Sequence, residues 1–249
     1  MKSYFITGGT TGIGWELARL YLEEGHRVAV CGRNLEKLPN GVKEKYSQLM
    51  TYQLSVTDEL ALDLAIKDFA KDGLDVVVAN AGISHGSKDR WPDREASKAI
   101  INTNIVGTIN AFFPALEIFK EKRKGQIVAI ASVAGFVGLP GASAYSASKG
   151  ALIHLCESYA LDLPNWGIDV TTICPGFIDT PLTKKNDHSM PFLMSCEKGA
   201  QKIKKAIDKK KVLYVFPWQM ALVMHLLRRL PRFLYRRIMK LPMADYSNK

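Results

Sequence analysis

The chain has 249 residues, 47% of them hydrophobic, which is enough for one large α/β domain with a sizeable core. The net charge of +10 lies at the end of the chain, because residues 197–249 carry 14 Lys or Arg against 3 Asp or Glu, whereas residues 1–196 carry 20 against 21. A neutral body argues against nucleic-acid binding and favours an acidic membrane surface or an acidic partner at one end. The four cysteines lie far apart without a CxxC pair or a His cluster, so we expect no metal site and no disulfide framework.

Apolar strands alternate with helical patterns along most of the chain. The first strand, residues 3–7, leaves no room for a secretory segment ahead of it, so we expect a cytoplasmic protein. The helix after it ends at Gly25, and a second helix begins at Thr57 or Asp58 and ends at Gly73. The other predicted strands are 27–31, 49–54, 74–80, 125–131, 168–174 and 211–217.

Most of these strands are nearly continuous in apolar residues, which is typical of a parallel sheet covered by helices on both faces. The repeated strand, helix, strand order predicts an α/β fold with a single Rossmann-type, doubly wound, mostly parallel sheet. We expect this domain to span residues 1–215 and a basic, helical extension to span residues 216–249. Ligands of such sheets bind at the carboxyl ends of the strands.

A glycine-rich turn, TGGTTGIG at residues 7–14, joins the first strand to the first helix. Gly8 allows a tight turn, while Gly12 and Gly14 let backbone approach a pyrophosphate and let the helix pack on the sheet. The alternative is a tight turn without a ligand. After the second strand stands Arg33 instead of an acidic residue, and a guanidinium can pair with the 2′-phosphate of NADP. This favours NADP(H), and NAD stays open if Arg33 is merely solvated.

Six motifs, in order and at matching spacing, resemble those of the short-chain dehydrogenase/reductase family, non-extended type. The resemblance covers residues 3 to about 182, and the motifs are TGGTTGIG at 7–14, ANAG at 79–82, NIVG at 104–107, ASVAG at 131–135, YSASK at 145–149 and PGFIDT at 175–180. Two positions depart from the family pattern. Ala79 replaces the first Asn of the ANAG turn, and Ser55 stands where an Asp usually meets the adenine, so adenine contacts there would rest on backbone groups.

The resemblance implies an enzyme that moves a hydride between a nicotinamide and a carbonyl/alcohol pair. The residues expected to hold NADP(H) are Gly8, Thr10, Thr11, Gly12, Ile13, Gly14, Arg33, Ser55, Asn80, Ala81, Gly82, Tyr145, Lys149, Pro175, Gly176, Ile178 and Thr180. The last of these is expected to contact the nicotinamide carboxamide.

The resemblance also implies a catalytic set of Asn104, Ser132, Tyr145 and Lys149. Tyr145 and Lys149 are four positions apart and share one helix face. A phenol with a pKa of ~10 is a poor acid-base catalyst near neutrality, but the ammonium and the oxidised nicotinamide favour the phenolate. Ser132 would hydrogen-bond the substrate oxygen, and Asn104 would hold a helix kink and a water that links Lys149 to solvent. The alternatives are a packing tyrosine, a strand-end serine and a satisfied helix asparagine.

Three histidines and a loop are further candidates. His154 lies in the apolar helix after Lys149, where we expect a packed or hydrogen-bonded residue. His85 and His188 are near enough to the motifs to touch substrate, but neither is assigned a role. Residues 181–197 are expected to form a mobile lid, and its methionines and Phe192 suit either an apolar substrate or simple packing of the lid.

Residues 218–242 carry six basic residues and no acidic ones. The uncharged stretch 212–227 contains Pro217 and is too short for a transmembrane span. On a helix over residues 232–240 the basic side chains share one arc and Leu234, Tyr235, Ile238 and Met239 share the other, a pattern typical of helices at an anionic membrane surface. The alternative is that the apolar arc packs on this subunit or on a second one.

Together these features predict an NADP(H)-dependent oxidoreductase for an apolar, lipid-like carbonyl or alcohol, peripheral to the cytoplasmic face of a membrane. A first alternative is a soluble reductase of 3-oxoacyl-carrier-protein thioesters, whose acidic carrier would meet the basic tail. A second is a non-catalytic dinucleotide-binding scaffold or sensor, which would not need the four catalytic residue types together. The family resemblance implies a homodimer or homotetramer.

Overall fold

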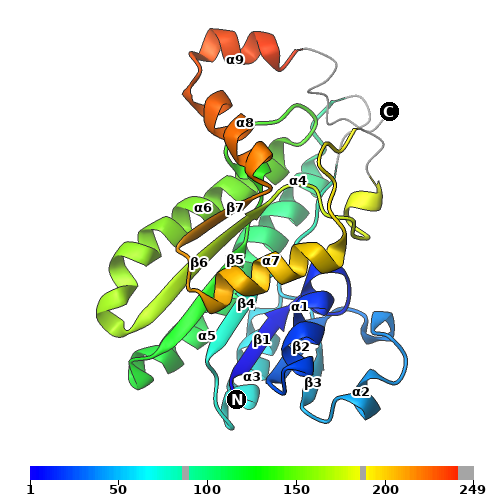
Figure 1. Ribbon diagram of the computed structural model, residues 1–249, viewed down its shortest axis with the longest axis vertical. Helices are drawn as coiled ribbons and strands as arrows, with labels where there is room; N and C mark the ends of the chain where they lie inside the picture. Colours follow the sequence, from blue (N-terminus) through cyan, green and yellow to red (C-terminus); the bar gives the residue numbers. More distant parts are fainter. Residues whose placement is uncertain (86–89, 186–188, 241–249) are drawn as a thin grey trace.

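The computed structural model describes residues 1–85, 90–185 and 189–240, and within them one seven-stranded sheet forms the centre of the molecule (Figure 1). Every pair of neighbouring strands is parallel, in the spatial order β3-β2-β1-β4-β5-β6-β7. The strands are β1 (Ser3–Thr7), β2 (Arg27–Gly32), β3 (Leu49–Gln53), β4 (Val76–Ala79), β5 (Gly125–Ile130), β6 (Ile168–Pro175) and β7 (Leu213–Phe216). The doubly wound parallel sheet predicted from the sequence is confirmed.

Helices lie on both faces of this sheet and, for α8 and α9, beyond its carboxyl end. They are α1 (Gly12–Glu23), α2 (Val42–Lys45), α3 (Glu59–Ala70), α4 (Arg94–Ile101), α5 (Gly107–Lys122), α6 (Ser143–Asp162), α7 (Cys196–Asp208), α8 (Trp218–Arg229) and α9 (Arg232–Ile238). Short helical turns connect several of them: η1 (Leu35–Lys37), η2 (Asn102–Val106), η3 (Val133–Gly135), η4 (Leu163–Trp166) and η5 (Thr183–Lys185).

Alternate residues of each strand face opposite layers, which is why the strands are apolar throughout. In β1, Tyr4 and Ile6 belong to the cluster that includes side chains of α1 and α7. Phe5, between them, belongs to the cluster on the other face, with side chains of α3, α5 and α6. The predicted cap of α3 is also confirmed, since the Asp58 carboxylate accepts a hydrogen bond of 3.1 Å from the backbone N–H of Ala61.

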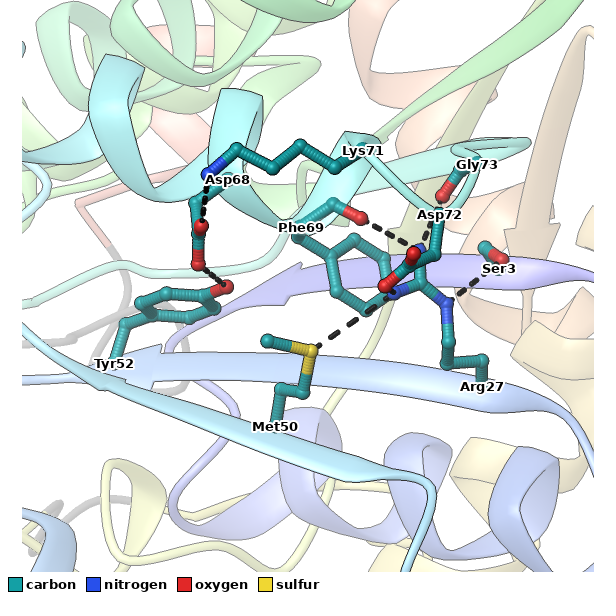
Figure 2. A network of polar contacts seen from close by, with 9 residues as sticks. All are labelled: Ser3, Arg27, Met50, Tyr52, Asp68, Phe69, Lys71, Asp72 and Gly73. Atoms are coloured by element: carbon teal, nitrogen blue, oxygen red, sulfur yellow. Dashed lines mark hydrogen bonds and ion pairs between the residues drawn. The ribbon is translucent and has the colours of Figure 1, made fainter.

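Arg27 ties the last turn of α3 to the amino-terminal end of the sheet (Figure 2). Its Nη2 donates to the carbonyl oxygens of Phe69 and Gly73 at 2.5 and 2.6 Å, and its guanidinium lies 3.9 Å from the centroid of the Phe69 ring. Nearby, Asp68 accepts hydrogen bonds from Tyr52 and Lys71. The Arg27 contacts lie where β2 begins, so they stabilise the end of the sheet opposite the carboxyl ends of the strands.

One helical stretch, Arg94–Lys122, is long and apolar enough to cross a membrane by length and composition alone. It consists of α4, η2 and α5, and half of its most apolar window is buried in the structure. Its buried side chains, such as Phe112 and Phe119, belong to the core cluster beneath the sheet. This is the behaviour of a core helix in a globular protein.

The last two helices lie beyond the carboxyl end of β7, at the orange and red end of the chain in Figure 1. The predicted boundary after residue 215 falls one residue before the end of β7. A helix was predicted over 232–240, and α9 occupies Arg232–Ile238. Part of its apolar arc packs on the protein itself, because Met239 is buried and the Tyr235 hydroxyl donates to the carbonyl oxygen of Gly138.

Candidate active site

A cavity of about 310 Å³ opens along the carboxyl ends of the strands. The predicted residues that line it are Gly8, Thr10, Thr11, Gly12, Ile13, Arg33, Ser55, Asn80, Ala81, Gly82, Ser132, Tyr145, Lys149, Pro175, Gly176, Ile178 and Thr180. Gly14 and Asn104 do not line it. The fold thus brings nearly all of the predicted site residues to one place, although they come from segments that are far apart in the sequence.

The glycine turn after β1 is held against the end of β4. Gly8 has a positive φ of +62°, and a Cβ at this position would lie 2.8 Å from the Cα of Ala81. A Cβ on Gly14 would lie 2.4 Å from the carbonyl oxygen of Gly8, so only glycine lets α1 begin this close to the turn. The Asn80 amide donates to the carbonyl oxygens of Thr7 and Gly8 at 3.0 and 3.1 Å. Asn80 therefore fixes the shape of the turn as well as lining the cavity.

Two basic residues lie beside the cavity where β2 ends. Arg33 was predicted there, and Lys37, on the turn η1, was missed although it also lines the cavity. Asn34 begins η1 by accepting a hydrogen bond of 2.8 Å from the backbone N–H of Glu36. This cap brings the chain round so that Lys37 returns to the same cavity as Arg33. A basic residue four positions after Arg33 was the signal in the sequence.

Leu54, Ser55 and Val56 line the cavity together after β3. The Ser55 hydroxyl is 2.8 Å from that of Thr57 and also accepts from the Thr57 backbone N–H at 3.3 Å. Because the side chain is engaged locally, what this segment offers the cavity is mainly backbone and the apolar side chains on either side.

Tyr145 and Lys149 lie on the first turns of α6, as predicted, and face the end of β5. The Lys149 Nζ donates to the carbonyl oxygen of Ile130 at 2.7 Å and lies 5.8 Å from the centroid of the Tyr145 ring. Ser132 follows β5 and begins η3, where its hydroxyl accepts from the backbone N–H of Ala134 at 3.1 Å. Its hydroxyl is also close enough to Tyr145 to lower the pKa of that phenol. A hydroxyl, a phenol and an ammonium therefore meet at one point of the cavity.

Burial is the main cause of the pKa shifts of Tyr145 and Lys149. It raises the pKa of Tyr145 above the ordinary value for a phenol, while the nearby Ser132 hydroxyl acts in the opposite direction. It lowers the pKa of Lys149 to about 8, because this residue is only 5% exposed and its charged form loses hydration. Near neutral pH the lysine is therefore mostly charged and the tyrosine holds its proton, which makes Tyr145 a potential proton donor.

Asn104 lies at an irregular turn between α4 and α5. The turn η2 has π-helical hydrogen bonding at the residue for which a helix kink was predicted. The fully buried Asn104 accepts from the backbone N–H of Ile83 at 2.8 Å and donates to the Ser148 hydroxyl at 2.9 Å. It therefore acts on the site through the segment after β4 and through α6, instead of lining the cavity.

The segment after β6 is fixed by a threonine that the sequence reading missed. The Thr183 hydroxyl donates to the carbonyl oxygen of Ile178 at 2.6 Å and accepts from the Thr180 backbone N–H at 2.9 Å. Thr183 lines the cavity, and so do Pro181 and Leu182. Ile178 is also bridged to Met194, so the residues just before the predicted lid pair with residues near its end. Nothing in the sequence distinguished Thr183 from a loop threonine.

The predicted packing of His154 is wrong. Its side chain is 70% exposed on α6 and lies 3.7 Å from the Glu157 carboxylate. His85 is exposed and does not line the cavity, and His188 lies outside the described residues. Over the described ranges, no group of three or more His, Cys, Asp or Glu side chains is placed to hold a metal ion.

The model of the family described as short chain dehydrogenase matches residues 2–191. The chain belongs to this family. A relative from Myxococcus xanthus, described as an uncharacterized oxidoreductase, is 34% identical over 239 residues, which cover 94% of each chain. A 3-oxoacyl-[acyl-carrier-protein] reductase of Thermotoga maritima is 34% identical over 189 residues, covering 74% of this chain and 77% of its own. These matches identify the protein as an oxidoreductase of the short-chain dehydrogenase family.

Solved structures of other proteins have the same fold. ElxO with NADP bound superposes with a TM-score of 0.76 at 29% identity, covering 86% of this chain and 96% of its own. A short chain dehydrogenase of Burkholderia cenocepacia in complex with NADP gives a TM-score of 0.83 at 22% identity, over 97% of this chain and 100% of its own. The second likeness supports the fold alone.

Proposed function

We propose that this protein uses NADP(H) to interconvert a carbonyl and an alcohol on an apolar substrate. The observation that carries the proposal is the meeting of Ser132, Tyr145 and Lys149 in a cavity that is also lined by the glycine turn and by Arg33. The NADP bound to ElxO, a 29% identical protein of the same fold, supports the choice of dinucleotide.

The residues present fit a dinucleotide phosphate. Gly8 and Gly12 line the cavity and both have positive φ, so bare backbone borders the cavity at the start of α1, where free N–H groups attract a pyrophosphate. Arg33 and Lys37 supply the positive charge that a 2′-phosphate requires and that the ribose hydroxyls of NAD do not. This arrangement favours NADP(H) over NAD.

The bound nicotinamide would supply or accept the hydride. In reduction, Ser132 hydrogen-bonds the substrate oxygen and Tyr145 donates its proton to that oxygen as negative charge develops. Lys149, held near the phenol ring by the carbonyl oxygen of Ile130, stabilises the phenolate that remains. In oxidation the same phenolate takes the proton back. Asn104 positions the backbone after β4 and the helix that carries Tyr145 and Lys149.

An apolar substrate is supported by the surroundings of Tyr145. The tyrosine packs against a cluster formed by η3, the segment that follows it and the inner face of α8, with Val137, Leu139 and Met220 buried. The lid adds Phe192 and Leu193, which are 51% and 48% exposed. A substrate with an apolar chain would bury the exposed side chains of Phe192 and Leu193 against itself, whereas a small polar carbonyl would not.

The test is NADPH-dependent reduction of ketones and 3-oxoacyl thioesters of increasing chain length, by the wild type and by Tyr145→Phe. We expect kcat to fall about a hundredfold to ten-thousandfold in the variant, while the Kd for NADPH changes little, because the lost group transfers a proton. Tyr159→Phe, on the same helix but away from the cavity, is the matched control. Unchanged turnover in Tyr145→Phe would refute the mechanism, and tight NADPH binding without turnover by the wild type would favour a scaffold.

A second candidate is a soluble reductase of carrier-protein thioesters. It is favoured by a groove along α7 that is lined by Lys198, Lys202, Lys205, Lys209 and Lys211, which would suit an acidic carrier. The relative from Thermotoga maritima carries this function in its name. Salt-sensitive binding of an acyl-carrier protein, lost when these lysines are replaced by glutamine, would favour this candidate.

A further inference from the structure

Helix α8 is apolar on two opposite faces. Its inner face buries Met220 and Met224 in the cluster beside Tyr145. On its outer face, Trp218, Leu222 and Leu226 follow one another at intervals of four residues and are 71%, 51% and 56% exposed. A surface helix of a globular protein normally presents polar residues on the side away from the core. The outer face of α8 is therefore suited to an apolar environment instead of water.

Helix α9 extends the same kind of surface. The large exposed hydrophobic side chains in the two helices are Trp218, Leu222, Val223, Leu226, Phe233 and Leu234. Single exposed hydrophobic residues are common on monomeric proteins, but six of them within two short consecutive helices mark an interaction site. Phe233 alone is 75% exposed and crosses the otherwise basic arc of α9.

The charge around this surface selects its partner. The exposed basic residues of the two helices and of the turn that follows them are Arg228, Arg229, Arg232, Arg236, Arg237 and Lys240, and residues 209–240 contain no Asp or Glu. Within the part of the chain that the structure describes, none of the six forms an ion pair. A second copy docked on the same surface would bring like charges together. An anionic bilayer instead offers a hydrocarbon layer for the tryptophan and leucines and phosphates for the arginines.

The inner face of α8 connects this surface to the active site. The backbone N–H of Gly176, which lines the cavity, donates to the carbonyl oxygen of Phe216 at 2.7 Å, just before α8 begins. A Cβ on Gly176 would lie 3.0 Å from Pro217 and 3.4 Å from Met220, so the first turn of α8 packs directly behind this glycine. An α-helix with its side chains is about 10–12 Å across. The outer face of α8 therefore lies about one helix diameter from the cluster that contacts Tyr145.

We propose that the outer face of α8, with Phe233 and Leu234 of α9, docks on an anionic lipid bilayer. Docking holds the cluster beside Tyr145 about one helix diameter from the lipid surface. This inference goes beyond the proposed function, because lipid docking requires neither turnover nor a bound dinucleotide.

The test is flotation of the full chain with vesicles of phosphatidylcholine, alone or mixed with phosphatidylglycerol. We expect at least about hundredfold stronger binding to the anionic vesicles, weakened by salt. Leu222→Gln with Leu226→Gln should abolish most of this binding, because the apolar anchor is lost. Arg228→Gln with Arg229→Gln and Arg232→Gln should weaken it by about a hundredfold.

Matched controls carry the same changes on other exposed surfaces. Leu60→Gln with Leu64→Gln alters two leucines of α3 that are 68% and 58% exposed, and Lys198→Gln with Lys202→Gln and Lys205→Gln removes three charges from α7. Both controls should bind vesicles like the wild type. NADPH titration of every variant, which requires neither lipid nor turnover, verifies that the fold and the dinucleotide site are intact.

Three results would overturn the proposal. The first is the absence of anionic-vesicle binding by a wild type that binds NADPH. The second is an equal loss of vesicle binding in the control variants, because the binding would then depend on the overall charge or hydrophobicity of the protein and not on α8 and α9. The third is a dimer in sedimentation velocity that dissociates in the Leu222 and Leu226 variant while vesicles are ignored, because the apolar face would then be a subunit interface.

Discussion

Removing the positive charge beside the cavity should lower the affinity for NADPH but not the affinity for NADH. Arg33→Ala, Lys37→Ala and the double variant delete the two basic side chains that line the cavity after β2. Neither residue forms an ion pair with another described residue, so both charges are available to a ligand. The 2′-phosphate distinguishes NADPH from NADH, and we expect these variants to weaken NADPH alone.

The size of the effect follows from exposure. Hydrogen bonds to charged groups contribute about 1.5–3 kcal/mol when shielded from water, whereas exposed ion pairs contribute about 0–1 kcal/mol. Arg33 and Lys37 are both exposed, so about 1 kcal/mol for each is the appropriate estimate. This corresponds to about fivefold for each single variant and about thirtyfold for the double variant. The same exposure predicts that NADPH affinity falls with added salt in the wild type and much less in the double variant.

The assay is titration of protein with NADPH and with NADH, followed by nucleotide fluorescence. Lys43→Ala with Lys45→Ala is the control, because both lysines are exposed on the neighbouring helix α2 and neither lines the cavity. The reasoning is refuted if the double variant binds NADPH as the wild type does. It is also refuted if both nucleotides weaken equally, since the loss would then reflect a damaged fold.

Three further predictions concern residues that shape the site or the sheet. Burial of Lys149 lowers its pKa from 10.5 to about 8, so the folded state loses this proton earlier than the unfolded state as the pH rises. The buried charge therefore destabilises the folded state below about pH 8, and this destabilisation disappears towards pH 10.5. In urea unfolding between these pH values, the free energy of unfolding of the wild type should rise by up to about 3 kcal/mol relative to that of Lys149→Met. Thr183→Val removes the hydrogen bonds to Ile178 and Thr180. We expect the free energy of unfolding in urea to fall by about 1–2 kcal/mol and NADPH binding to weaken. Unchanged NADPH binding would show that the lid does not depend on this hydroxyl. Arg27→Met leaves the carbonyl oxygens of Phe69 and Gly73 without their donor. We expect the free energy of unfolding in urea to fall by about 3 kcal/mol, with no change in NADPH affinity. The control Lys71→Met, at a side chain that is 75% exposed, should lower the free energy of unfolding by less than about 1 kcal/mol.

The sheet could be predicted because each strand is recognised from a run of consecutive apolar residues. Strands buried on both faces must be apolar at every position, so runs such as Val76–Ala79 stand out without knowledge of the tertiary structure. The glycines of the first turn and the pair Tyr145 and Lys149 were also readable, because a close backbone approach and a shared helix face impose residue type and spacing.

What could not be predicted depends on contacts between distant segments. Thr183 matters because its hydroxyl meets Ile178 within a folded loop, and no local pattern encodes that contact. His154 lies in a helix whose sequence is apolar on average, but the side that packs is chosen by α4 and β6, and His154 falls on the other side. Lys37 could have been predicted, because the capped turn η1 is a local structure and is enough to bring this lysine to the same cavity as Arg33.

The C-terminal helices show why an amphipathic pattern alone does not identify the buried face. The sequence marks one apolar arc on α9, but Tyr235 and Met239 of that arc pack against the segment around Gly138. The exposed apolar surface comes mainly from α8, which has apolar side chains all round and therefore no preferred face in the sequence. Because Met220 and Met224 occupy one side and Trp218, Leu222 and Leu226 the other, substitutions on the outer side should leave the packing beside Tyr145 intact. The proposed docking can therefore be tested separately from the proposed catalysis through a single helix, and the outer-face variants are the ones to use for that purpose.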